Sequence, residues 1–294
     1  ELGYKGFTTT GKALMPTVTN VNNVSMVTGV FPKVHGITSN YRLDRRSGRE
    51  YYMETAEDIM AETMFQRASR LGATSLLVTA KDKLRLLLGD STSYSISSER
   101  PSSWIVSMVG EPPPIYSLEV NGWVIDAANY ALSTTAANVV YIATTDYAMH
   151  MYRPEDTHSQ EHMDILDAAI GRLVDSHPNA QVLITADHGM ASKNHMIDLQ
   201  STLTEYGLKS NVVPVIKDRY TVHHSNLGGS TFVYMQESQV PEAIAILHQT
   251  RGVDHALTKE EASARYQLHP DRIGDIFVLG GPDVVFGNPA MVPI

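Results

Sequence analysis

Three short apolar runs without polar alternation constrain the fold of this chain most strongly. They cover residues 73–80 (ATSLLVTA), 137–144 (ANVVYIAT) and 181–186 (QVLITA). Runs of this kind are typical of strands that are buried on both faces, as in a parallel sheet. Amphipathic helical patterns occur between the runs, over residues 55–71 and 162–176. Because strands alternate with helices, the sequence predicts an α/β fold with a mainly parallel sheet.

Two parts of the chain depart from this alternation. Residues 83–135 include a stretch rich in Ser and Pro (STSYSISSERPSS), which we interpret as a cap or lid inserted between core strands. Residues 201–294 carry strand patterns of their own, at 231–235 and 275–279, and a helical pattern at 241–249. We therefore expect residues 1–82 and 136–200 to form the core, residues 83–135 a lid, and residues 201–294 a second cap-like excursion with a partial return to the core.

Composition excludes several classes of function. The 294 residues include no cysteine, so disulfide scaffolds, thiolate zinc sites and a cysteine nucleophile are excluded, and a cytoplasmic address is expected. The net charge of -9 and the lack of a basic run argue against nucleic acid as a partner. No apolar stretch reaches the ~18 residues of a membrane span, so no membrane partner is expected.

Two pairs of an acid and an imidazole follow the apolar runs. Asp146 and His150 follow the second run in "TTDYAMH", and Asp187 and His188 follow the third in "TADHGM". Ligands of parallel sheets bind outside the carboxyl ends of the strands. The four-residue spacing places Asp146 and His150 on one helical face. Carboxylate and imidazole together suit zinc or manganese, although each pair alone is also compatible with a helix cap or a loop pair.

A nucleophile candidate occurs near the start of the chain. In "MPTVTNVNNVSMVTG", Thr19 precedes a short helical run that ends at Gly29. At a helix N-terminus the unpaired N–H groups favour an anion. A threonine hydroxyl becomes a good nucleophile only beside a base or a metal. The alternative is that Thr19 is a simple helix cap.

A pair of lysines just past the first apolar run is a candidate anion clamp. Lys81 and Lys83 are separated by one residue in "VTAKDKL". Extended chain would direct both ammonium groups to one side. The alternative is that both lysines are simply solvated.

The stretches "PTVTNVNNVSMVTGVFPKVHGI", "TTDYAMH" and "TADHGM", in this order, resemble the alkaline phosphatase superfamily in its nucleotide pyrophosphatase/phosphodiesterase-like branch. Within that branch the chain is most similar to the phosphonoacetate hydrolase family. The resemblance covers most of the chain. It implies an alkaline phosphatase-like three-layer α/β sandwich, a small anionic phosphonate substrate, two Zn²⁺ ions and a homodimer. The same donors would also suit Mn²⁺ or Fe²⁺.

The resemblance assigns the metal-site residues by position. It implies that Thr19 is the nucleophile and touches the metals. It implies that Asp187 and His188 bind the first zinc, and that Asp146 and His150 bind the second.

The resemblance also assigns the substrate contacts. Asn40, in "HGITSNYRLD", corresponds to an asparagine that donates to a phosphoryl oxygen. Lys81 and Lys83 correspond to a lysine pair that holds the carboxylate of the substrate. The implied reaction is zinc-dependent cleavage of the C–P bond of phosphonoacetate to acetate and phosphate through a phosphothreonine intermediate.

Two ligands of the family pattern have no counterpart in this sequence. No aspartate precedes Thr19, and no histidine in a His-Gly context follows Asp283. We therefore expect a chain truncated at both ends, with weak zinc binding and slow turnover. We do not favour a substitute ligand among His158, His162 and His195. His35 is expected to pack beside the Thr19 turn, and structural roles are assigned to His177, His223, His224, His248, His255 and His269.

Two alternative functions remain open. A phosphodiesterase or nucleotide pyrophosphatase of the same superfamily would need an aromatic slot for a base and would not need the lysine pair. A metal-deficient, non-catalytic fragment would keep the fold without turnover. An isomerase resembling phosphoglycerate mutase is less favoured, because that family uses serine where this chain has Thr19.

Overall fold

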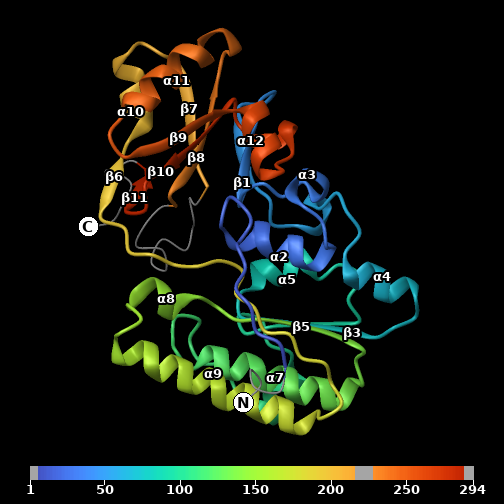
Figure 1. The fold of residues 1–294 in the computed structure, drawn as a ribbon. Helices are drawn as coiled ribbons and strands as arrows, with labels where there is room; N and C mark the ends of the chain where they lie inside the picture. The colour runs from blue at the N-terminus through green and yellow to red at the C-terminus, as the bar shows by residue number, and fades with distance from the viewer. Residues whose placement is uncertain (1–5, 216–227, 288–294) are drawn as a thin grey trace.

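The computed structural model describes residues 6–215 and 228–287, so His223 and His224 lie outside the described residues. The chain forms two layered parts with a helical region between them (Figure 1). A parallel sheet with two long helices makes the lower part in that view, and an antiparallel sheet with three helices makes the upper part. Within the described residues no helix is both long enough and apolar enough to cross a membrane.

The parallel sheet of the lower part has the strand order β4-β3-β5. The strands are β3 (Ser75–Thr79), β4 (Tyr94–Ser97) and β5 (Val139–Ala143). The apolar runs at residues 73–80 and 137–144 are therefore confirmed as neighbouring parallel strands. Side chains of β3 alternate between two hydrophobic clusters, Leu77 in one and Leu76 and Val78 in the other. This alternation explains why Leu76, Leu77 and Val78 are apolar in succession, since both faces of the strand are buried.

Helices cover both faces of this sheet, which confirms the layered α/β fold. One face packs against α2 (Thr19–Thr28), α4 (Met64–Arg70) and α5 (Asp82–Leu88). The other face packs against α7 (Val120–Thr135), and α9 (Thr157–Ser176) lies along α7. The helical pattern at residues 162–176 is thus confirmed. The short helices of these layers are α3 (Pro32–His35), η1 (Ala56–Asp58), α6 (Ser103–Val109) and α8 (Tyr147–Met151).

The upper part is built on a four-stranded antiparallel sheet with the order β7-β8-β10-β9. Its strands are β7 (Ser210–Pro214), β8 (Ser230–Met235), β9 (Val253–Thr258) and β10 (Ile276–Gly280). Its helices are α10 (Leu199–Glu205), η2 (Glu237–Gln239), α11 (Val240–Gln249), α12 (Lys259–Tyr266) and η3 (Pro270–Arg272). A parallel pair, β6 (His195–Ile197) with β11 (Val284–Phe286), lies beside it. The two strand patterns and the helix expected in this region are confirmed.

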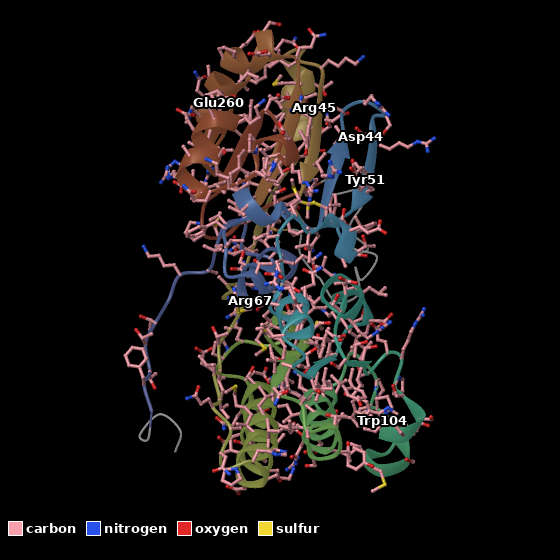
Figure 2. All side chains as sticks on the ribbon, turned by 90° about the vertical axis from the view of Figure 1, so that its right-hand side faces the viewer. Asp44, Arg45, Tyr51, Arg67, Trp104 and Glu260 are labelled. Atoms are coloured by element: carbon pink, nitrogen blue, oxygen red, sulfur yellow. The ribbon has the colours of Figure 1, made fainter. Side chains whose placement is uncertain are left out.

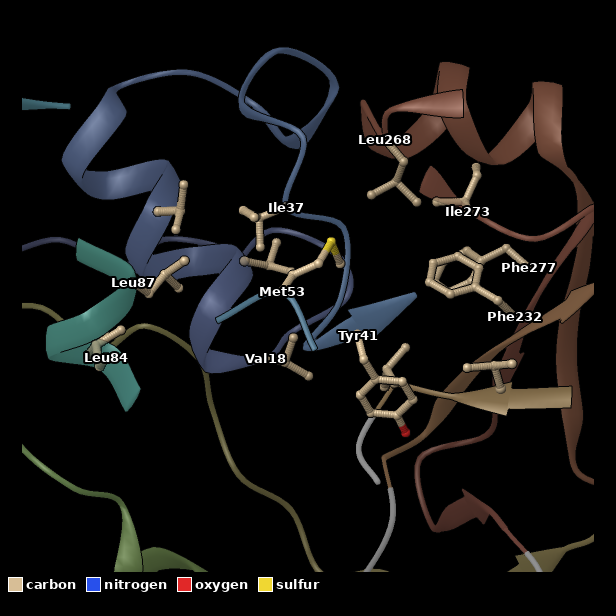
Figure 3. Close-up of a cluster of buried hydrophobic side chains, with 14 of the residues drawn as sticks. Val18, Ile37, Tyr41, Met53, Leu84, Leu87, Phe232, Leu268, Ile273 and Phe277 are labelled. Atoms are coloured by element: carbon tan, nitrogen blue, oxygen red, sulfur yellow. The ribbon is translucent and has the colours of Figure 1, made fainter. Parts of the chain in front are cut away.

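The hairpin of β1 (Tyr41–Asp44) and β2 (Arg49–Tyr52) connects the helical region to the upper part. Arg45, labelled in Figure 2, makes two hydrogen bonds of 3.0 and 2.8 Å to the carboxylate of Asp275. A shared hydrophobic cluster completes the connection. Figure 3 shows Tyr41 and Met53 between the α2 side and the stacked rings of Phe232 and Phe277, whose centroids are 4.8 Å apart.

The apolar run at residues 181–186 is not a buried strand, and that prediction is wrong. The segment has no regular secondary structure, and the side chain of Leu183 is 93% exposed. In the described part of the chain, the parallel sheet ends at β5, and no strand pairs with this run. An apolar run becomes a buried strand only where a neighbouring strand satisfies its backbone N–H and C=O groups.

Two further predictions from the sequence differ from the structure. Residues 83–135 are not a lid, because β4 belongs to the parallel sheet and α7 covers one of its faces. The helix expected over residues 55–71 begins only at Met64. The side chain of Thr63 accepts a hydrogen bond from the backbone N–H of Gln66, and Gln66 bonds back to the N–H of Thr63, so a capping box starts the helix there.

Candidate active site

Thr19 is the first residue of α2, and its hydroxyl group does not cap the helix. The N-cap is Val18, and no side chain caps the helix. The alternative that Thr19 is a simple helix cap is therefore wrong. The Thr19 Oγ1 atom instead lies 3.5 Å from Nε2 of His188.

The tautomer of His188 follows from its second contact. Its Nδ1 atom lies 3.0 Å from the backbone carbonyl oxygen of Gly189. A carbonyl oxygen can only accept, so in the neutral ring Nδ1 carries the proton and Nε2 keeps its lone pair. That lone pair faces Thr19. His188 can therefore accept a proton from the Thr19 hydroxyl or bind a cation beside it.

Asp187 joins this cluster through a network that starts on α2. Asn23 donates from Nδ2 to Oδ2 of Asp187 and to the backbone carbonyl of Thr19, both at 3.0 Å. The hydroxyl of Tyr141, on β5, donates to Oδ1 of Asn23 at 2.8 Å. The other carboxylate oxygen of Asp187 accepts from the backbone N–H of His188 at 3.0 Å. Burial, and then the negative charge of Asp187, raise the pKa of Tyr141, so this hydroxyl stays a proton donor.

A second cluster lies past the end of β5. Asp146 accepts from Nζ of Lys81 at 3.2 Å through Oδ1, and its Oδ2 lies 3.0 Å from Nε2 of His150. Asp146 is the N-cap of α8, and His150 is four residues further on. The predicted common face of Asp146 and His150 is therefore present.

The backbone before Asp146 is held by a buried asparagine. Asn121, on α7, donates from Nδ2 to the carbonyl of Thr145 and accepts from the N–H of Thr145, both at 2.7 Å. Asn121 is only 1% exposed. This two-way pairing fixes the residue directly before the Asp146 carboxylate.

The lysine pair lies only partly in extended chain, because the backbone of Lys81 is extended whereas Lys83 is helical. Lys81 is the N-cap of α5 and Lys83 is its second residue. Both are buried, at 8% and 5% exposure, so the alternative of two solvated lysines is wrong. The intervening Asp82 accepts from Ser97 Oγ at 2.7 Å and from Arg85 Nε at 2.6 Å, which anchors the turn that carries the pair.

Asn40 is linked to the start of α2 through the backbone of Met53. The N–H of Met53 donates to the carbonyl of Asn40 at 2.8 Å, and the carbonyl of Met53 accepts from Nδ2 of Asn20 at 3.0 Å. Asn40 is 7% exposed, and its Oδ1 has no hydrogen-bond partner within the described structure. A buried amide with an unused acceptor beside the nucleophile helix is a suitable position for contact with a polar ligand.

The two clusters lie at the same end of the parallel sheet. The N–H of Ala80 donates to the carbonyl of Ala143 at 2.9 Å, so the ends of β3 and β5 are adjacent. Lys81 follows the first of these strands and Asp146 the second. Tyr141, on β5, contacts the network of Asp187, so both clusters border one strand.

Carboxylate and imidazole groups are suitable ligands for a divalent cation, but each cluster contains few of them. Each cluster offers one carboxylate and one imidazole, and Thr19 adds a hydroxyl to the first. Across residues 6–215 and 228–287, no group of three or more His, Asp or Glu side chains could hold a metal ion. Zinc sites use three or four protein ligands, so these clusters are incomplete by that standard.

Three residues of this site are missed by reasoning from sequence, namely Asn23, Tyr141 and Asn121. A signal exists for Asn23, because asparagine is disfavoured inside helices and "TNVNNVS" has three of them. A similar signal exists for Tyr141, the one residue with a polar atom in "VVYIA". A buried polar side chain needs a hydrogen-bond partner, which here is found only in three dimensions.

Comparisons with known proteins place these motifs in a family context. The family described as type I phosphodiesterase/nucleotide pyrophosphatase matches residues 2–292. Two crystal structures of phosphonoacetate hydrolase from Sinorhizobium meliloti 1021, in complex with phosphonoformate and with phosphonoacetate, are similar to this chain with a TM-score of 0.86. They are 32% and 33% identical to it, and each match covers 94% of this chain and 73% of the other.

More distant relatives agree with the fold. Murine ectonucleotide pyrophosphatase/phosphodiesterase 5 matches with a TM-score of 0.68 at 16% identity, over 96% of this chain and 72% of that chain. An ectonucleotide pyrophosphatase/phosphodiesterase of Caenorhabditis elegans is 25% identical over 210 residues, which are 66% of this chain. That match spans 25% of the curated relative's length.

Proposed function

Because this chain belongs to the type I phosphodiesterase/nucleotide pyrophosphatase family, we propose that it is a hydrolase that cleaves the C–P bond of phosphonoacetate to acetate and phosphate. The observation that carries the proposal is the burial of Lys81 and Lys83 at the end of β3, with Lys81 in contact with Asp146. Buried ammonium groups favour an anionic ligand that can replace water around them. The Sinorhizobium meliloti structure in complex with phosphonoacetate supports this choice of substrate.

Thr19 would supply the nucleophile. Its hydroxyl proton passes to solvent, because Nε2 of His188 is needed as a cation ligand, and its Oγ1 then attacks phosphorus. The O–P bond forms as the C–P bond breaks, and the electron pair of that bond goes to carbon. Water then hydrolyses the phosphothreonine, which releases phosphate and restores the hydroxyl.

Lys81 and Lys83 would stabilise the leaving group. The methylene carbon that leaves phosphorus carries a negative charge, which the adjacent carboxylate shares as an enediolate until carbon is protonated to acetate. Two ammonium groups at this carboxylate interact more strongly with the transition state, where the negative charge grows, than with the bound substrate. This difference lowers the barrier. The leaving group of a phosphodiester is an alkoxide. It carries no carboxylate that the two lysines could stabilise.

A pair of divalent cations would complete the site. The residues that would hold them are Asp187, His188 and Thr19 on one side and Asp146 and His150 on the other. Bound zinc supplies Lewis-acid stabilisation of the phosphoryl oxygens and lowers the pKa of the attacking hydroxyl. The Asn40 side chain would donate to a further phosphoryl oxygen.

The test compares two substrates and two kinds of lysine variant. Phosphate release from phosphonoacetate and nitrophenol release from bis(p-nitrophenyl) phosphate are measured with Zn²⁺ present. We expect Lys81→Ala with Lys83→Ala to lower kcat/KM for phosphonoacetate by about 100-fold or more while diester hydrolysis changes little. Lys209→Ala, at an exposed position between α10 and β7, is the matched control and should leave both rates unchanged.

Two outcomes decide against the proposal. Faster hydrolysis of the diester than of phosphonoacetate by the unaltered chain would favour a phosphodiesterase. A chain that binds Zn²⁺ but releases no product from either substrate would favour a non-catalytic protein.

A further inference from the structure

The segment that carries Asp187 and His188 is not held by a sheet. Residues 181–186 have no ladder hydrogen bonds in the described structure, and most of their side chains are exposed. By contrast, Asp146 follows β5 directly, and Asn121 fixes the backbone before it. The position of Asp187 relative to Thr19 therefore depends on side-chain contacts rather than on strand pairing.

We infer that Asn23 is a positioning residue that holds Asp187 in register with the nucleophile Thr19, and that the Tyr141 hydroxyl supports the Asn23 amide by bonding to its oxygen. This inference rests on the function proposed above. Asn23 is 4% exposed and lies one turn after Thr19 on α2. Its Nδ2 group has two hydrogens, and the two acceptors within 3.0 Å are the Thr19 carbonyl and Asp187 Oδ2.

The orientation of the Asn23 amide is determined by its three partners. A flipped amide would place Oδ1 against the Thr19 carbonyl and the Asp187 carboxylate, where oxygen faces oxygen. It would also reverse the contact with Tyr141, whose hydroxyl donates to Oδ1 at 2.8 Å and would then have to accept from Nδ2. The Thr19 carbonyl and the Asp187 carboxylate can only accept, so they select the orientation in which Asn23 donates to Asp187, and the Tyr141 hydroxyl occupies the remaining amide atom.

One amide group consequently connects the backbone of the nucleophile to the carboxylate beside it. A hydrogen bond to a carboxylate is stronger than one between neutral groups. Together with the bond from the His188 N–H to the other oxygen, it fixes the orientation of the Asp187 carboxylate. Neutral donors that orient a metal-binding carboxylate in this way typically change metal affinity or activity by about 10- to 100-fold when they are removed.

The first test compares Asn23→Ala with Asn22→Ala. Asn22 is a matched control, because it is buried on the same helix but bonds to Leu14 and Val18 instead of Asp187. We expect Asn23→Ala to lower Zn²⁺ affinity, measured by competition with a chromophoric chelator, and kcat for phosphonoacetate, each by about 10- to 100-fold. KM should change little, because the lysine pair is untouched. Tyr141→Phe should give a smaller loss in the same two quantities.

Asn22→Ala should change neither quantity beyond about two-fold, even if it lowers the unfolding midpoint. The inference is overturned if Asn23→Ala keeps both Zn²⁺ affinity and kcat. It is equally overturned if Asn22→Ala reduces them as much, because loosening of the helix would then explain both results.

A second test separates this inference from the proposed function. Urea unfolding midpoints are measured without metal for Asn23→Ala, Asp187→Ala and the double variant. If the two residues hold each other, the double variant is destabilised by less than the sum of the two single variants. A non-additive result supports the inference even for a chain that hydrolyses no phosphonoacetate, whereas additive shifts overturn it even for an active one.

Discussion

The hydroxyl oxygen of Thr19 lies 3.5 Å from Nε2 of His188, although the two residues are 169 positions apart. The Nδ1 atom of the same ring bonds to the Gly189 carbonyl, so the lone pair of Nε2 faces the hydroxyl. This relationship connects the first turn of α2 to a segment without regular structure. It gives Thr19 a partner that can accept its proton or bind a cation beside it.

Removal of the Thr19 hydroxyl should abolish turnover with little effect on folding. We expect Thr19→Ala to lower phosphate release from phosphonoacetate by at least about a thousand-fold, because the nucleophile is lost. The unfolding free energy should change by less than ~1 kcal/mol, since no helix cap is removed. Thr28→Ala is the control on the same helix, where the hydroxyl bonds only to the Val24 carbonyl within the described contacts. Retention of activity by Thr19→Ala would assign the nucleophile elsewhere.

The sequence predicted the strands that have neighbours on the sheet. The runs at residues 73–80 and 137–144 became β3 and β5, because each pairs with an adjacent strand and is covered by helices. The run at residues 181–186 is similarly rich in apolar residues but has no pairing partner in the described structure. Composition reports the tendency of a segment to be buried in a sheet, whereas pairing depends on other parts of the chain.

Local spacing predicted part of the candidate site for a similar reason. Asp146 and His150 are four residues apart, so one helical turn brings them together whatever the rest of the fold does. The contacts of Asn23 with Asp187 and of Tyr141 with Asn23 span 164 and 118 positions. No local pattern encodes such pairs, and they become visible only when α2, β5 and the Asp187 segment are placed together.

Removal of the Lys81 charge should strengthen the binding of zinc and weaken the binding of the substrate. Its ammonium group contacts the Asp146 carboxylate at 3.2 Å, where it competes with any cation that binds there. We expect Lys81→Met to strengthen Zn²⁺ binding by about three- to ten-fold, the equivalent of roughly 0.7 to 1.4 kcal/mol. The same variant should raise KM for phosphonoacetate about ten-fold, because a charged hydrogen bond to the substrate is lost. Calorimetric zinc titration and steady-state kinetics measure the two effects, and a fall in zinc affinity would contradict the competition.

Metal should bind this chain weakly. Within the described residues each cluster offers one carboxylate and one imidazole, and zinc sites normally use at least three protein ligands. We expect elemental analysis after gel filtration to find less than one zinc ion per site. Dialysis against a chelator should stop phosphate release, and added Zn²⁺ should restore it. Two tightly retained zinc ions together with a normal enzyme rate would contradict this prediction.

The buried His35 should make the stability of the chain depend on pH. Burial lowers the pKa of His35 from 6.5 to about 4, with a smaller contribution from the nearby charge of Arg272. Its Nδ1 accepts from the N–H of Ile37 and its Nε2 contacts Ser25 on α2, so protonation would break the first of these bonds. The unfolded chain binds the proton at higher pH than the folded chain, and stability therefore falls as pH drops from 6.5 towards 4, by roughly 3 kcal/mol in total. Urea unfolding at pH 7.5, 6 and 5 measures this loss. The His35→Gln variant should be less stable than the unaltered chain at pH 7.5, but its unfolding free energy should change less between pH 7.5 and 5. If the unfolding free energies of the two proteins fall in parallel with pH, the pH dependence belongs to other groups.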